Sequence, residues 1–132
     1  MFLRAAGQFK KLFPVASIVP HNYVASALYD GKPVTMTVTK IPDEDAQLRF
    51  VSAVRNTALN IGPERAERAA RQWRENNPSS PCELTSERKG DAAEFELSMV
   101  APYSEATTDA EFVKTADLFL AALDSFYDLA GR

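Results

Sequence analysis

The stretch that decides the fold is CELTSERKGDAAEFELSMVA, at residues 82–101. Within it Phe95, Leu97 and Met99 alternate with polar or small side chains, and this period of two predicts a strand with one buried face. The polar run RKGD at residues 88–91 predicts a turn with a strand on either side of it. We therefore predict an antiparallel β-hairpin whose apolar face needs a covering layer.

A long helix is predicted at the end of the sequence, over residues 108–132. Thr108, followed three residues later by Glu111, forms a capping box, which marks a helix N-terminus. Behind this cap, apolar side chains recur at helical spacing for about six turns. They are Phe112, Ala116, Phe119, Leu120, Leu123, Phe126, Tyr127 and Ala130. We expect this wide stripe to cover the sheet and close the core of the domain.

A shorter helix is predicted before the hairpin, over residues 64–76, with Pro63 at its first position. Its apolar stripe consists of small side chains and one large anchor, and such a stripe lets another element approach closely. The stripe is Ala66, Ala69, Ala70 and Trp73. Tryptophan is a frequent interface anchor, so we predict a two-fold dimer interface on these residues. The arginines on the opposite face alternate with glutamates, which favours a solvated face over a phosphate-binding row.

The first half of the chain predicts a helix and three strands. A helix over residues 1–13 would place apolar side chains on one face, at Phe2, Ala6, Phe9 and Phe13. The strands are expected at residues 23–29, 33–39 and 48–55. The second strand is the clearest, because Val34, Met36 and Val38 alternate with threonines.

The predicted element order is therefore α-β-β-β-α-β-β-α, in a single domain over residues 1–132. This order defines an α+β protein in which the helices pack on one face of an antiparallel sheet. Such a sheet leaves edge strands, and an unprotected edge invites pairing with another chain.

Composition narrows the class of protein. Hydrophobic residues make up 45% and charged residues 25% of the 132 residues, and the net charge is −3. These values are ordinary for a globular protein and argue against general nucleic-acid binding. No apolar run is long enough for membrane insertion, and the single cysteine, Cys82, fits a reducing, cytoplasmic location.

The sequence shows no catalytic set, and we expect no catalytic, cofactor-binding or metal-binding residues. His21 is the only histidine and Cys82 has no second cysteine, so a zinc site lacks ligands. Glu94 and Glu96 lie on the wet face of a predicted strand, where nothing would raise a carboxyl pKa for acid–base work. The glycines form no phosphate-binding motif. We therefore expect a protein that is not an enzyme.

The second half of the chain resembles the YbjN family of bacterial sensory-transduction regulators. The matching features are the helix end RQWRENN at residues 71–77, the strand–turn–strand over residues 83–100, and the closing helix with its phenylalanines. That family shares its fold with type III secretion chaperones, whose element order the whole chain resembles. The resemblance implies a small dimeric protein without catalysis or a cofactor, and a protein or peptide client as partner.

We therefore expect a non-enzymatic, dimeric, chaperone-like or regulatory protein-binding module of bacterial type. Its client would bind an apolar surface on the first helix and one strand face, formed by Phe2, Phe9, Phe13, Val34, Met36 and Val38. The alternatives are a dedicated type III secretion chaperone for one effector, and a small-molecule-binding or enzymatic domain with an apolar pocket. A further alternative is a membrane-surface protein that uses the basic first helix.

Overall fold

A computed structural model describes residues 2–14, 17–19, 24–40 and 46–131 of the chain. Its helices are α1 (Phe2–Leu12), the short 3-10 helix η2 (Asn56–Leu59), α2 (Pro63–Asn76) and α3 (Asp109–Gly131). Its strands are β1 (Ser17–Val19), β2 (Val24–Tyr29), β3 (Lys32–Thr39), β4 (Ala46–Arg55), β5 (Cys82–Lys89) and β6 (Ala92–Tyr103). The predicted α+β class is confirmed.

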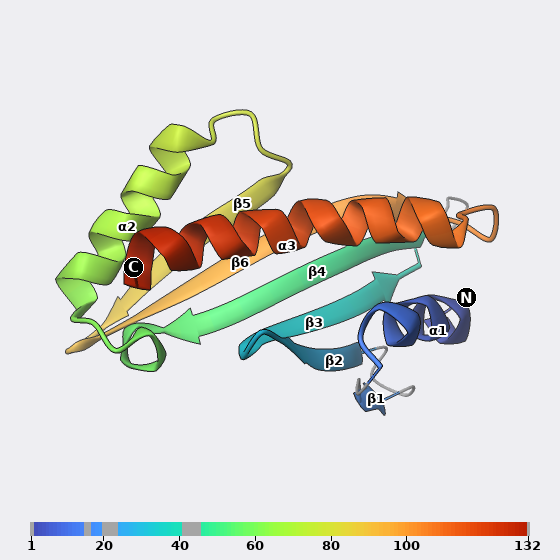
Figure 1. Cartoon of the computed structure of the whole chain (residues 1–132), viewed down its shortest axis with the longest axis horizontal. Coiled ribbons are helices and arrows are strands. Elements are labelled where there is room, and N and C mark those ends of the chain that lie inside the picture. Colours follow the sequence, from blue (N-terminus) through green and yellow to red (C-terminus); the bar gives the residue numbers. More distant parts are fainter. Residues whose placement is uncertain (1, 15–16, 20–23, 41–45, 132) are drawn as a thin grey trace.

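The strands form one antiparallel sheet in the order β1-β2-β3-β4-β6-β5. The sheet has six strands, one more than the sequence predicts, because β1 is too short to show an alternating pattern. Apart from β1 and the short helix η2, the order of the elements matches the prediction. Figure 1 shows α3 running along the sheet over β4 and β6, with α1 near β3 and α2 near β5.

The core is built from one face of the sheet. A row of buried side chains crosses the strands from β2 to β5 through directly paired positions: Ala25, Met36, Phe50, Met99 and Cys82. This alignment exists because the alternation of apolar and polar residues in each strand is in phase with that of its neighbours. The row therefore forms a continuous apolar floor beneath the helices.

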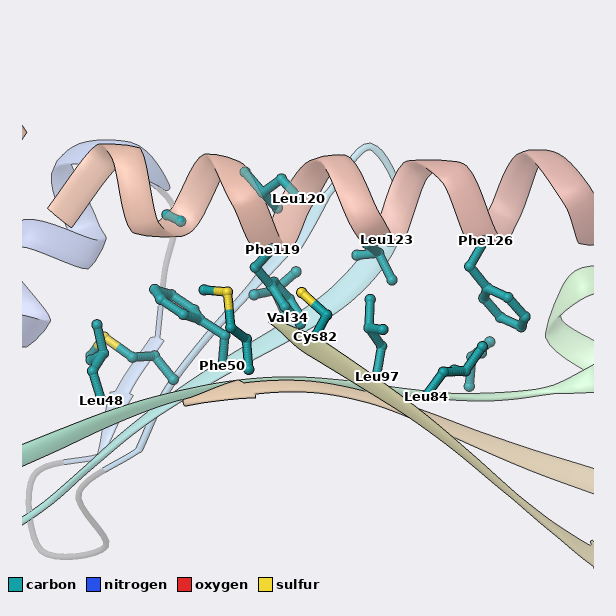
Figure 2. Packing of buried hydrophobic residues seen from close by; sticks show 14 of the residues in the cluster. Val34, Leu48, Phe50, Cys82, Leu84, Leu97, Phe119, Leu120, Leu123 and Phe126 are labelled. Carbon is teal, nitrogen blue, oxygen red and sulfur yellow. The ribbon is translucent and has the colours of Figure 1, made fainter. Parts of the chain in front are cut away.

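Helix α3 covers this floor. Phe119, Leu123 and Phe126 project from α3 toward side chains of the sheet (Figure 2). Phe50 lies in the middle of the core, because its ring centroid is 5.6 Å from that of Phe119 and 6.5 Å from that of Phe9. A single side chain of β4 therefore contacts both α3 and α1, and the predicted role of the α3 stripe as core closure agrees with the structure.

Local signals place the ends of these elements. The backbone N–H of Glu111 donates to Thr108 Oγ1 at 3.1 Å, and the N–H of Thr108 donates to Glu111 Oε1 at 3.3 Å, so the predicted capping box is confirmed. The β2–β3 turn has Asp30 at φ 50° and Gly31 at φ 78°. Two consecutive positive φ values are typical of the hairpin turn whose twist matches that of its strands.

Candidate protein-binding surface

The predicted client-binding residues lie in the core rather than on the surface. Phe2, Phe9, Phe13, Val34, Met36 and Val38 are all buried, with at most 7% of each exposed. They are buried because α1 packs against β3, and because α3 also covers the sheet, with Phe119 above Val34 (Figure 2). In this structure these side chains are therefore not accessible to a client.

Polar contacts hold α1 in this position. Gln8 Nε2 donates to Asp109 Oδ1 at 2.9 Å, and Tyr103 Oη donates to Gln8 Oε1 at 2.6 Å. Lys11 forms an ion pair with the same Asp109 at 2.8 Å. Arg4 donates to the carbonyl oxygen of Ser104 at 3.0 Å. The polar side chains of α1 therefore contact the end of β6, the start of α3 and the segment between them.

The predicted dimer interface is also covered within the chain. Ala66, Ala69, Ala70 and Trp73 are buried, because α2 packs with this stripe against α3 and the sheet. Trp73 Nε1 donates to Ser125 Oγ on α3 at 2.7 Å. The close approach that the small side chains predict therefore occurs within one protomer. The stripe is not exposed, so it is not available as a dimer interface in this structure.

Of the residues with potential chemistry, His21 lies outside the described residues, whereas the surroundings of Cys82 and Glu94 can be described. Cys82 is buried, and burial raises the pKa of its thiol, which keeps it protonated. Glu94 forms ion pairs with Lys89 at 3.1 Å and with Arg55 at 2.8 Å, and hydrogen bonding from Lys89 is the largest effect that lowers its pKa. Within the described residues, no cluster of three or more histidine, cysteine or carboxylate side chains could hold a metal ion.

One buried charge was missed by sequence reasoning. Lys32 is only 5% exposed, and its ammonium lies 2.7 Å from Asp124 Oδ1. It also lies 5.5 Å from the ring centroid of Tyr29 and 5.2 Å from that of Tyr127. Burial opposes the charge, but the hydrogen bond and attraction to Asp124 outweigh it and raise the pKa of Lys32. This lysine therefore stays protonated, which does not suit it to act as a nucleophile or a base.

A surface pocket of about 290 Å³ adjoins Lys32, between the β2–β3 turn, η2 and the end of α3. Its polar lining is Lys32, Tyr127 and Asp30, and Lys32 lies 3.6 Å from Asp30 in addition to its contact with Asp124. The pocket brings no nucleophile together with a base. Lys32 is instead paired with Asp30 and Asp124.

The opposite face of the sheet is polar, and we call it the open face. On it, Arg49 pairs with Glu96 at 2.9 Å across β4 and β6. The salt bridges of Arg55 and Glu94 lie on the same face, beside a shallow depression of about 410 Å³ between β4, β6 and β5. Side chains of the open face are half-buried or exposed, in contrast with those beneath the helices.

The open face ends at the edge strand β5. Among the described residues, β5 pairs with β6 on one side and with no strand on the other. Only Cys82 and Leu84 of this strand are buried, and the five residues from 85 to 89 are all exposed. An edge of this kind presents backbone N–H and C=O groups that can pair with another strand.

The chain was compared with protein families, curated proteins and solved structures. No family model, curated protein or solved structure matches the chain. Among the described residues, none of the helices has the length and apolar character needed to cross a membrane.

Proposed function

We propose that this protein is a non-enzymatic, dimeric protein-binding module, chaperone-like or regulatory, that binds an extended segment of a client protein along β5. The observation that carries the proposal is the eight-residue edge strand β5, whose outer side has no strand partner among the described residues. An extended peptide that adds a strand to such an edge gains main-chain hydrogen bonds without needing a deep pocket.

The state of the reactive groups supports a binding role rather than catalysis. Lys32 is held protonated by Asp124, and burial keeps the Cys82 thiol protonated. Catalysis by a lysine or cysteine needs the deprotonated form, which a lowered pKa or a neighbouring base provides. Neither group has that support here, so recognition is the function that the described surface fits best.

The charges of β5 indicate the chemistry of the client. Glu83 and Glu87 are exposed, and both belong to the set of alternate residues whose side chains point to the open face. The basic residues of β5 already have partners: Arg88 is bound to Glu64 and Glu67 of α2, and Lys89 is bound to Glu94 of β6. Opposite charges stabilise cross-strand pairs. The proposed client segment therefore carries basic side chains at alternating positions.

The test is site-specific photo-crosslinking of the full chain, with a photoreactive amino acid at Thr85 and, as the matched control, at exposed Lys10 on α1. We expect adducts with a client from position 85 and none from position 10. A synthetic peptide of the crosslinked segment should then slow amide hydrogen exchange in β5. Crosslinking from position 10 alone, or unchanged exchange in β5, would overturn the proposal.

A further inference from the structure

The outward face of α3 carries an apolar patch that the core does not use. Val113 is 39% exposed and Leu118 is 52% exposed, although both belong to a helix whose other face closes the core. With four neighbours they line a shallow groove of about 380 Å³. The six lining residues are Ala110, Val113, Lys114, Asp117, Leu118 and Ala121, and we call them the α3 outer face.

The α3 outer face is self-complementary when it is read in opposite directions. Its six residues form three pairs that are symmetric about the midpoint between Thr115 and Ala116. From the midpoint outward, the pairs are charged, large apolar and small. Lys114 and Asp117 are the central pair, Val113 and Leu118 the next, and Ala110 and Ala121 the outermost. A surface with this symmetry matches a copy of itself turned by a two-fold axis.

We infer that the α3 outer face binds a second copy of this chain, with the two α3 helices antiparallel. This inference rests on the dimer of the proposed function and names the surface that forms it. In this arrangement Lys114 of each protomer lies at the level of Asp117 of the partner subunit, so two ion pairs form. A parallel arrangement would instead bring Lys114 to Lys114 of the partner subunit, so the charges select the antiparallel one.

The free charges of the face support this partner. Among the ion pairs within the described residues, none involves Lys114 or Asp117. Both side chains are exposed. Each is therefore available to a partner, and a second copy offers both opposite charges in the required order.

Helical geometry places the apolar residues where they would shield these ion pairs. At 3.6 residues per turn, Lys114 and Asp117 lie near the centre of the face, and Leu118 and Val113 lie on its two flanks. In the antiparallel pair, the two Leu118 side chains cover one side and the two Val113 side chains cover the other. The alanines at both ends let the helix backbones approach closely. The contact over residues 110–121 is about 18 Å long. A contact this short is small for a stable dimer, so we expect dimerisation to depend on protein concentration.

Charge reversal in the full-length chain tests this inference by sedimentation equilibrium, between about 1 and 300 µM protein. K114D or D117K alone brings like charges together at both ion pairs, and we expect the dimer Kd to rise at least about tenfold. The double variant K114D/D117K restores opposite charges and should restore the Kd. A mixture of the two single variants should form a heterodimer. K10D, which changes an exposed charge on α1, is the matched control.

The outcomes separate this inference from the proposed function. A wild-type dimer that K114D and D117K leave unchanged would overturn the α3 interface and keep the dimer, which must then use another surface. A wild-type chain that stays monomeric throughout would overturn the α3 interface and the dimeric state together, while the β5 crosslinking still tests client binding. Weakening by both single variants without recovery in the double variant or the mixture would overturn the antiparallel pairing.

Discussion

Lys32 and Asp124, 92 residues apart in the sequence, lie in direct contact, with 2.7 Å between the ammonium nitrogen and a carboxylate oxygen. Lys32 is the first residue of β3, and Asp124 lies near the end of α3. The pair therefore binds the β2–β3 hairpin to the helix that closes the core. Tyr29 Oη also donates to Asp124 at 3.4 Å, which adds a second link between the same elements.

The first prediction concerns this pair. D124N leaves the buried Lys32 ammonium without its main counter-charge, and we expect the free energy of unfolding to fall by about 2 kcal/mol. Asp124 is 42% exposed, and water reaching the pair limits the loss. Urea denaturation followed by circular dichroism measures it. The double variant K32M/D124L, which removes both charges, should recover most of the stability. Equal midpoints for D124N and wild type would contradict the assigned role.

The second prediction concerns Asp109 and how the free energy of unfolding changes at acidic pH. Hydrogen bonds from Lys11 and then Gln8 lower the pKa of Asp109 below its ordinary value of 3.8. A lowered folded-state pKa stabilises the fold above the unfolded-state pKa, and this contribution is lost as the pH falls through the folded-state pKa. We expect D109N to show a shallower loss of unfolding free energy than wild type below about pH 4. Parallel slopes for the two proteins would contradict the contact between α1 and α3.

The third prediction concerns the centre of the core. Phe50 contacts the rings of Phe112 and Phe119 at centroid distances of 5.9 and 5.6 Å, and it is 1% exposed. F50A should therefore lower the free energy of unfolding by about 3 to 5 kcal/mol, because it leaves a cavity in the core beneath α3. L28A is the matched control, since Leu28 is 66% exposed on β2. L28A should lower the free energy of unfolding by less than about 0.5 kcal/mol. A larger loss for L28A than for F50A would contradict the assignment of Phe50 to the centre of the core.

Sequence reasoning reached those features that depend on local signals. The capping box at Thr108 and Glu111 and the alternation around Phe95 are each encoded within a few residues, and the structure contains both. The missed features depend on long-range placement. Nothing near Lys32 in the sequence indicates Asp124, and three residues of β1 cannot establish a period. The stripe around Trp73 was predicted as a dimer interface, whereas in the structure it packs against α3 of the same chain. Periodicity shows that a helix face is packed but does not show against what.

The fourth prediction uses that contact. Trp73 is the only tryptophan, so its fluorescence reports on one position. It is 2% exposed, and its indole N–H donates to Ser125 Oγ. S125A removes the acceptor without opening a large cavity, so we expect an unfolding free energy about 1 kcal/mol lower from the unpaired N–H. S125T keeps a hydroxyl and is the matched control.

Because the proposed dimer uses the α3 outer face, dilution of wild-type protein from dimer to monomer should leave the emission maximum of Trp73 unchanged. A red shift on dilution would show instead that α2 takes part in the dimer interface.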